Sequence, residues 1–457
     1  MIRRTAMDAT PSTTTRGAAT PTGTTLPPGP RLPMPVQTLL WLLRPVSTMH
    51  RWRKRYGDVF TIRLVLAGNS VQVCDPALLK PIFTAKPDDA RAGEANAVLE
   101  PVLGRSSTLL LDGREHLRHR KLLLPPFHGE RMQRYGEIIA TATAVEMERW
   151  PVGRAFPLRP AMQRITLDVI LRAVFGLHDG DELDQLRPLV RELVDTTRSR
   201  AAMIPWLRHE MGGRSPWGHF VATRRRTDAL LHDIIRQRQN DPDVAQRDDV
   251  LSMLVQARDE SGEAMTVEEL RDELMTLLLA GHETTATSLA WCFQLLLLNP
   301  QELAKLRDDL AQGSTARLDA VIKETMRIRP VVPVVARRLH APLQVGEWTL
   351  PKGVMVAPNI ELIHHRDDLY PQPDQFRPDR FVDAQTETYE WLPFGGGVRR
   401  CLGASFAIFE MRTVIPIVLR RASLTLADGT LDRVRRAAVV MVPERGVRVI
   451  QQRPLSA

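Results

Sequence analysis

The fold is decided by the stretch Phe394-Gly395-Gly396-Gly397-Val398-Arg399-Arg400-Cys401-Leu402-Gly403. Its glycines let the backbone turn tightly and approach a flat ligand. Cys401 directly precedes the stretch Leu402 to Arg420, which is predicted to be a helix. Unpaired N–H groups at a helix start can hold a thiolate. A single cysteine is most often a small buried apolar residue, but this setting indicates a metal-binding thiolate.

This segment resembles the cysteine-ligand loop of the cytochromes P-450, which reads F-G-x-G-x-R-x-C-x-G. All six specified positions match, which chance would supply in about one window in 10⁷ to 10⁸ at a residue usage of about 5%. The resemblance implies haem b (iron protoporphyrin IX) as the cofactor and Cys401 as its axial iron ligand, with Phe394 and Gly403 beside the haem. Such a thiolate favours cleavage of the O–O bond.

The other two cysteines, Cys74 and Cys292, form no CxxC or Cys/His spacing with Cys401. An odd, sparse count argues against a disulfide framework and fits a reducing compartment. We therefore expect Cys74 and Cys292 to be buried apolar residues, and the protein to be a bacterial cytoplasmic monomer.

Composition places the chain among ordinary globular proteins. Its 457 residues are 43% hydrophobic and 25% charged, so most of the chain can form a packed core. The net charge of +9 arises from 62 basic and 53 acidic residues that are interspersed, so binding to nucleic acid is not expected. The basic cluster 51–55 is typical of a solvated helix face, with an anionic membrane surface as the alternative.

Residues 1–25 are rich in Thr, Ala and Pro and hold few bulky apolar side chains. This composition predicts a disordered tail, with a transit peptide as the alternative. Residues 26–457 are expected to form a single catalytic domain. The apolar run from Val36 to Leu43 is too short to span a membrane.

The longest predicted helix runs from Thr266 to Asn299. It opens with a capping box of Thr266 and Glu269, and its roughly 34 residues would extend about 50 Å. Polar residues at Glu273 and Glu283 interrupt its apolar run, which favours a core helix over a membrane span. The remaining periodicity predicts strands at 59–64, 71–73 and 447–449. From the end of the second strand to residue 330 it predicts mostly helices.

The centre of that helix carries Ala280-Gly281-His282-Glu283-Thr284. This stretch resembles the oxygen-activation motif A-G-x-[DE]-T of the same family. The resemblance implies that Ala280 lies beside the haem and that Glu283 and Thr284 deliver protons to bound dioxygen. The alternative is a threonine that merely bonds to a carbonyl of its own helix.

A second family motif, E-x-x-R, matches Glu324 and Arg327, which share one helix face at a spacing of three. In the family this pair is buried and linked to an arginine of a following loop, which matches Arg380. The resemblance implies a structural role for these three residues, behind the cysteine loop.

A third match, Gly113 to Arg120, resembles the helix that holds a haem propionate, usually W-x-x-x-R. Here His116 stands in the place of the tryptophan. Together with Arg337 and Arg399, His116 and Arg120 are expected to bind the propionates, since the arginine fork suits a carboxylate.

The resemblance covers nearly everything after residue 26. It implies a mainly α fold with a smaller β-rich part, a triangular helical prism with haem between the long central helix and the cysteine loop. The expected activity is a monooxygenase that hydroxylates or epoxidises an apolar small molecule: a fatty acid, terpenoid, steroid or polyketide. Because about 35 residues follow the last helix, electrons are expected from a separate ferredoxin or flavodoxin with its NAD(P)H reductase.

Two alternatives stay open. A non-oxygenating haem-thiolate sensor would need no proton delivery, so the Glu283–Thr284 pair argues against it, as it does against direct use of peroxide. A basic nucleic-acid or membrane binder would need no cysteine loop. The substrate pocket is expected to be lined by the aliphatic stretches 97–99, 275–280, 331–335 and 439–441.

Removal of residues 1–25 is predicted to leave haem content and activity unchanged, because this stretch lacks core-forming side chains. The measurement compares the full and truncated chains for haem absorbance and turnover. Loss of haem, or loss of a membrane association that the full chain shows, would contradict the prediction.

Overall fold

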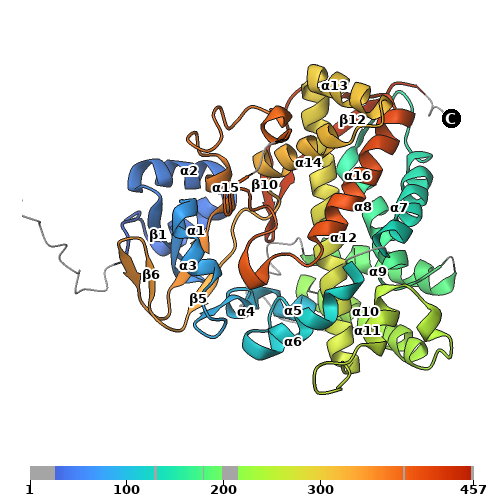
Figure 1. Ribbon diagram of the computed structural model, residues 1–457, viewed down its shortest axis with the longest axis horizontal. Coiled ribbons are helices and arrows are strands. Elements are labelled where there is room, and N and C mark those ends of the chain that lie inside the picture. Colours follow the sequence, from blue (N-terminus) through green and yellow to red (C-terminus); the bar gives the residue numbers. More distant parts are fainter. Residues whose placement is uncertain (1–25, 128–130, 179, 198–214, 384–385, 454–457) are drawn as a thin grey trace, which may run out of the picture.

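The computed structural model describes residues 26–127, 131–178, 180–197, 215–383 and 386–453. The predicted tail, residues 1–25, lies outside the described residues. Within the described ranges no helix has both the length and the apolar character that a membrane crossing requires. Figure 1 shows a helical part on the right and a smaller β-rich part on the left.

Helices dominate the chain. Their bounds are α1 (Met34–Leu43), α2 (Pro45–Tyr56), α3 (Lys80–Phe83), α4 (Ala92–Ala95), α5 (Glu100–Leu103), α6 (Gly113–Leu123), α7 (Arg131–Met147), α8 (Leu158–Ala173), α9 (Asp181–Thr197), α10 (Pro216–Gln239), α11 (Val250–Gln256), α12 (Val267–Leu298), α13 (Pro300–Ala311), α14 (Ala316–Ile328), α15 (Ile360–His364) and α16 (Ala404–Arg421).

The strands form small sheets. Their bounds are β1 (Val59–Leu64), β2 (Gly68–Val73), β3 (Ala90–Arg91), β4 (Ala155–Pro157), β5 (Arg337–Leu339), β6 (Leu343–Val345), β7 (Trp348–Leu350), β8 (Met355–Pro358), β9 (Leu424–Leu426), β10 (Val434–Ala437), β11 (Val440–Pro443) and β12 (Arg448–Gln451). The largest sheet has the order β1-β2-β8-β5-β3, in which β2 and β8 are parallel and the other pairs antiparallel.

The mainly α fold with a smaller β-rich part is confirmed. The central helix is confirmed almost to the residue, since α12 spans Val267–Leu298 with Thr266 as its N-cap, and both hydrogen bonds of the capping box with Glu269 are present. The first predicted strand is β1, and the last lies at β12. Local signals therefore fixed these boundaries.

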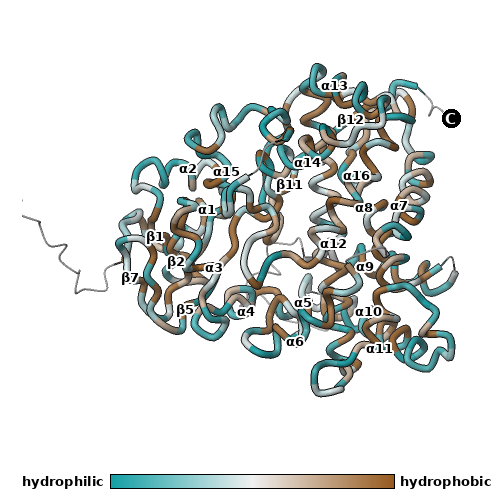
Figure 2. The backbone as a smooth tube through the Cα atoms, in the orientation of Figure 1, coloured by the Kyte–Doolittle hydropathy of each residue, from teal (hydrophilic) through white to brown (hydrophobic). Residues whose placement is uncertain are grey.

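α12 forms the axis of the helical part. It packs against α8, α10, α14 and α16 in the largest hydrophobic core, and Figure 1 shows it crossing the helical part beside α16. Figure 2 shows apolar residues along these inner segments and polar residues along the outer turns. Most residues of α12 are buried, so an exposed residue in its middle marks an opening beside the helix.

The Glu324–Arg327 pair lies at the centre of the segments behind the cysteine loop. Both side chains are fully buried on α14, with Arg327 Nε 2.6 Å and Arg327 Nη2 2.9 Å from the two carboxylate oxygens of Glu324. Arg380 Nε lies 3.3 Å from the same carboxylate, which also accepts the backbone N–H of Arg377. Arg327 also donates to the carbonyl oxygen of His364. The pair is therefore a tertiary link and not a surface bridge.

Glu324→Ala and Arg327→Ala are each predicted to prevent stable haem incorporation. Each change leaves a buried charge unpaired, which costs about 3–5 kcal/mol. Lys305→Ala is the matched control, because Lys305 and Glu302 have the same spacing of three but the lysine is exposed, where a pair contributes only about 0–1 kcal/mol. Haem content and melting temperature are measured, and equal values for the buried and exposed variants would contradict the prediction.

Candidate active site

Cys401 lies in the loop that leads into α16. Its backbone N–H donates to the carbonyl oxygen of Phe394 at 2.9 Å, which closes the loop. The N–H of Gly403 donates to the Cys401 sulfur. The helix begins at Ala404, with Gly403 as its N-cap, about two residues later than the sequence predicted.

The surroundings of the Cys401 sulfur act on its pKa in opposite directions. The residue is accessible, yet the protein around the sulfur desolvates it, and this raises the pKa of the thiol above its ordinary value. The hydrogen bond from Gly403 and the positive charges of Arg120 and Arg400 lower it. These three groups favour the thiolate form, which is the form that binds metals.

The glycines of the loop serve a purpose that the sequence did not predict. Gly397 has a φ of +66°, and a Cβ there would lie 2.2 Å from the carbonyl oxygen of Phe83, at the end of α3. A Cβ on Gly396 would lie 3.1 Å from the Phe83 ring. Besides the tight turn and the close approach of a flat ligand that the sequence predicts, Gly396 and Gly397 allow the loop to pack on α3.

Four basic residues predicted to bind the propionates come together from three separate segments. His116 and Arg120 lie on α6, Arg337 begins β5, and Arg399 precedes Cys401. The pKa of His116 is lowered to about 3, mainly by burial and then by the charges of Arg399, Arg120 and Arg337. These residues therefore share one electrostatic environment.

This cluster contains more positive charge than its neighbours offset. Arg399 is paired with Asp112 at 2.6 Å, whereas the guanidinium of Arg337 donates only to the carbonyl oxygen of Ala336 in the contacts described. Burial, followed by the repulsion from Arg399, lowers the pKa of Arg337 to about 10. A buried arginine cluster of this kind requires an anion.

Two buried polar atoms beside the cluster have no hydrogen-bond partner among the described residues: His116 Nδ1 and Thr108 Oγ1. The carbonyl oxygen of Thr108 accepts from Arg399, which places Thr108 at the same cluster. Carboxylates satisfy both unpaired donors and the excess positive charge. The residues present thus fit a cofactor with acidic groups, and the nearby thiol fits its metal.

The central helix opens onto the interior at Ala280. This residue is exposed although it lies in the middle of α12, where most residues are buried. Thr284, one turn later, donates its hydroxyl to the carbonyl oxygen of Ala280 at 2.6 Å. The bond within the helix, which the sequence left as the alternative, is therefore present in this structure.

Glu283 is held by α8. Its carboxylate is 2.5 Å from Arg159 Nη2 and accepts from the side chain of Gln163. Gly281 also faces α8, since a Cβ there would lie 2.9 Å from Ile170 Cδ1. The lack of a side chain at Gly281 therefore lets α8 pack closely against α12.

Several site residues were missed by the sequence reasoning: Thr108, Asp112, Arg159 and Gln163. None belongs to a motif with a recognisable spacing, and each lies more than a hundred residues from a partner that it contacts. No local signal could have found them, because their roles follow from the packing of α8 and of the segment before α6.

An accessible cysteine beside a cluster of basic residues, and a long helix exposed at its middle, are the features that the resemblance of the cysteine loop predicted. The protein-family model of cytochrome P-450 matches residues 27–449, and the chain belongs to this family. Haem b is accordingly its cofactor and oxygen insertion its reaction class.

Relatives in Mycobacterium carry the same family name. Cytochrome P-450 135B1 of Mycobacterium tuberculosis is 44% identical over 435 residues, which cover 93% of this chain and 91% of the relative. Cytochrome P-450 138 of the same organism is 39% identical over 429 residues, which cover 94% of this chain and 96% of the relative.

Solved structures agree with the fold. The retinoic-acid-bound cyanobacterial protein CYP120A1 has a TM-score of 0.82 at 25% identity, covering 95% of this chain and 100% of its own. The haem domain of cytochrome P-450DA has a TM-score of 0.78 at 23% identity and covers 94% of this chain and 98% of its own, which supports the fold alone.

Cys401→Ala is predicted to abolish the red-shifted carbon-monoxide absorption band that marks thiolate ligation. Cys74 and Cys292 are fully buried in hydrophobic cores, and burial raises the pKa of the Cys292 thiol to about 12. Cys74→Ala is the control and is expected to keep the band. A band that persists in Cys401→Ala would show that another residue ligates the iron.

Proposed function

We propose that Cys401 is the axial iron ligand, and that His116, Arg120, Arg337 and Arg399 bind the haem propionates. The observation that carries this proposal is the convergence of these basic residues beside Cys401, with His116 Nδ1 buried and unpartnered. Phe394 closes the cysteine loop and Gly403 hydrogen-bonds the sulfur, which are supporting positions for the cofactor.

We propose that Ala280 faces the haem and that Glu283 and Thr284 supply protons at the opening. When bound, haem supplies the iron at which dioxygen is reduced. The Thr284 hydroxyl has one hydrogen and two lone pairs. While it donates to Ala280 it still accepts from water, and it can hold a water at the opening. Glu283 requires release from Arg159 before its carboxylate can face the same water.

The proposed substrate is an apolar small molecule, of fatty acid, terpenoid, steroid or polyketide type, that is hydroxylated or epoxidised. Two of the four expected wall segments adjoin, because the N–H of Met441 in β11 donates to the carbonyl oxygen of Val331. β11 also contacts α12, the helix that carries the third segment. Ala97 and Val439 are exposed, as Ala280 is.

One structural neighbour supports the terpenoid class among these four, because the cyanobacterial protein CYP120A1 holds retinoic acid. Retinoids are therefore placed first in a substrate screen that follows the spin-state shift of the haem band. A screen in which no apolar compound of the four types shifts the band, while polar ones do, would contradict the proposed class.

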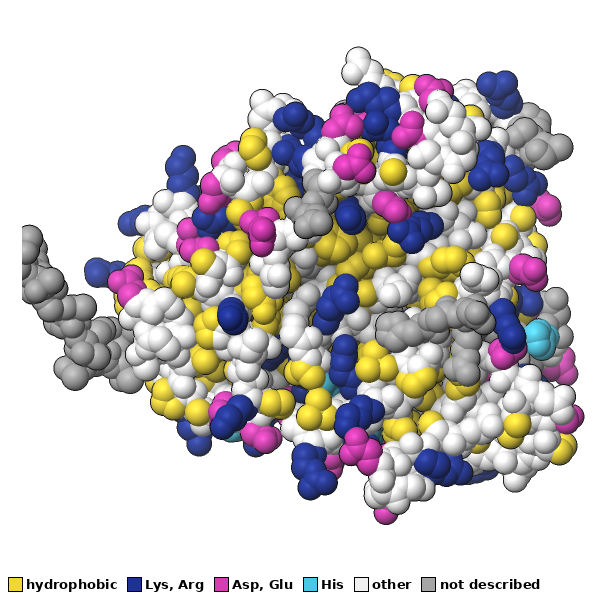
Figure 3. All heavy atoms as spheres, in the orientation of Figure 1, with side chains coloured by type: hydrophobic (Ala, Val, Ile, Leu, Met, Phe, Trp, Pro, Cys, Tyr) yellow, Lys and Arg dark blue, Asp and Glu magenta, His cyan; other side chains and the backbone are white. Residues whose placement is uncertain are grey.

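The proposed electron donor is an acidic ferredoxin or flavodoxin with its NAD(P)H reductase. Figure 3 shows Lys and Arg side chains in a column down the middle of one face, over α6 and the loop before α16. Arg400, in that loop, is exposed. Arg412, on α16, forms two hydrogen bonds to Asp319 and contributes less. Such a surface suits an acidic partner.

The organisation that we propose is a single domain, residues 26–457, acting as a monomer in the bacterial cytoplasm. Its three cysteines are all free, which supports a reducing compartment.

Thr284→Ala is predicted to keep haem and substrate binding, yet to divert a large share of the reducing equivalents to hydrogen peroxide. The variant removes the hydroxyl that holds water at the opening but leaves Cys401 and the basic cluster intact. Product formed per nicotinamide consumed is measured with a surrogate ferredoxin and its reductase. Thr284→Ser retains the hydroxyl and is expected to restore coupling.

Unchanged coupling in Thr284→Ala would mean that another group organises the protons, and Thr284 would then be only a helix residue bonded to its own backbone. Glu283→Gln is expected to slow turnover, because it keeps the shape of the side chain and removes the ionisable group.

A further inference from the structure

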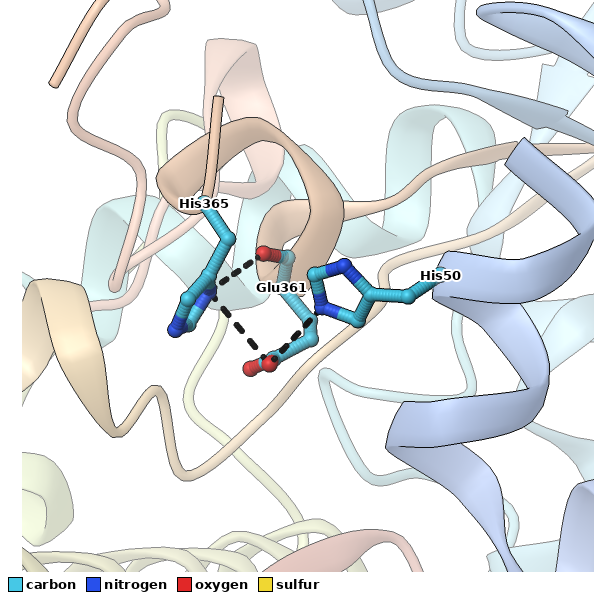
Figure 4. A group of neighbouring side chains, drawn as sticks. All are labelled: His50, Glu361 and His365. Atoms are coloured by element: carbon cyan, nitrogen blue, oxygen red, sulfur yellow. Dashed lines mark hydrogen bonds and ion pairs between the residues drawn. The ribbon is translucent and has the colours of Figure 1, made fainter. Parts of the chain in front are cut away.

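A group of metal-ligating side chains lies in the β-rich part, between α2 and α15. It consists of His50 on α2, Glu361 on α15 and His365 at the end of α15. Figure 4 shows the two imidazole rings on opposite sides of the Glu361 carboxylate. One ligand atom from each residue lies within 4.8 Å of the others, so the three can reach a common point.

The atoms of the group are farther apart than direct hydrogen bonds require. His365 Nδ1 lies 3.3 Å and His50 Nε2 lies 3.6 Å from the same Glu361 oxygen, Oε1. Charge-assisted hydrogen bonds are shorter, about 2.7–2.9 Å. Ligands of a tetrahedral zinc ion at about 2.0–2.1 Å are separated by roughly 3.3–3.4 Å. The two oxygen–nitrogen distances are therefore close to those between ligands of one ion, and the two nitrogens lie within 4.8 Å of each other.

The chemistry of the group also suits a cation. Glu361 is buried and offers a carboxylate, and each neutral imidazole offers one nitrogen with a lone pair. Arg329 contributes positive charge nearby, which weakens binding of a cation, whereas neither histidine carries charge when it is a ligand.

We propose that His50, Glu361 and His365 bind a divalent transition-metal ion, with Zn²⁺ as the expected occupant. Two imidazoles and one carboxylate are a known ligand set for zinc, and the His50 side chain is 35% exposed, so solvent can reach the fourth position. His365 Nδ1 donates its N–H to the carbonyl oxygen of Glu361 at 2.8 Å. On metal binding the neutral ring takes the tautomer that carries its hydrogen on Nε2, and the lone pair of Nδ1 then faces the ion.

The site would clamp α2 onto α15. The neighbouring residue, His364, accepts the N–H of Leu392 at the start of the cysteine loop, and its carbonyl oxygen accepts from Arg327. A bound ion therefore stabilises the segment that supports the cysteine loop without touching the haem residues. This role is independent of the proposed oxygenation.

The test uses haem-loaded, tag-free full-length protein that has been washed with a chelator and is then titrated with zinc sulfate by calorimetry. Haem loading keeps Cys401 from contributing a thiolate. The wild type is expected to bind one zinc ion more per chain than His50→Gln, or at least about ten-fold more tightly at that site. Zinc is also expected to raise the melting temperature of the wild type but not of the variant.

His340→Gln is the matched control, because His340 has similar exposure and a single partner, Glu94, at 2.9 Å. It is expected to behave as the wild type does. Glu361→Gln removes the anionic ligand while keeping its shape and is expected to behave as His50→Gln does. Normal haem absorbance of each variant shows that it is folded.

Failure of the wild type to bind zinc, or equal zinc binding and stabilisation in the wild type and in His50→Gln, would overturn the proposal. The group would then be a buried carboxylate between two histidines. Neither result bears on the Cys401 or Thr284 variants.

Discussion

The cysteine loop depends on the buried Glu324–Arg327 pair, through an unbroken path of contacts. Arg327 donates to the carbonyl oxygen of His364, and His364 Nε2 accepts the N–H of Leu392. The carbonyl oxygen of Leu392 accepts the N–H of Gly395, where the loop that ends at Cys401 begins. A change at α14 thus reaches the iron ligand without a direct contact.

His364 can serve in this path only as a neutral ring. Its Nε2 must accept from Leu392, so the hydrogen is on Nδ1, which faces the carbonyl oxygen of Arg327. Burial and the charge of Arg327 lower the pKa of His364 to about 3. The same guanidinium that anchors the segment therefore also keeps the histidine in the form that the loop requires.

Features encoded within a few residues could be predicted from the sequence. The capping box at Thr266, the strand Val59–Leu64 and the spacing of Glu324 and Arg327 all depend on local geometry. The last helix begins at Ala404, with Gly403 at its N-cap, about two residues later than the sequence predicted. The partners of Glu283 and the contacts of the glycines depend on which helix packs alongside, and no spacing encodes that.

The two residues expected to deliver protons are held with different strength. Thr284 uses a neutral hydrogen bond to Ala280, and exchanging such a bond for one to water changes the free energy by about 0.5–1.5 kcal/mol. Glu283 is held by a nearly buried guanidinium, and separating such a pair costs several kcal/mol. The threonine can therefore turn to the opening readily, whereas the carboxylate turns only if Arg159 finds another partner. The Thr287 hydroxyl already accepts a hydrogen bond from Arg159 Nε at 3.0 Å. Because this bond remains when Glu283 moves away, it lowers the free-energy cost of releasing Glu283.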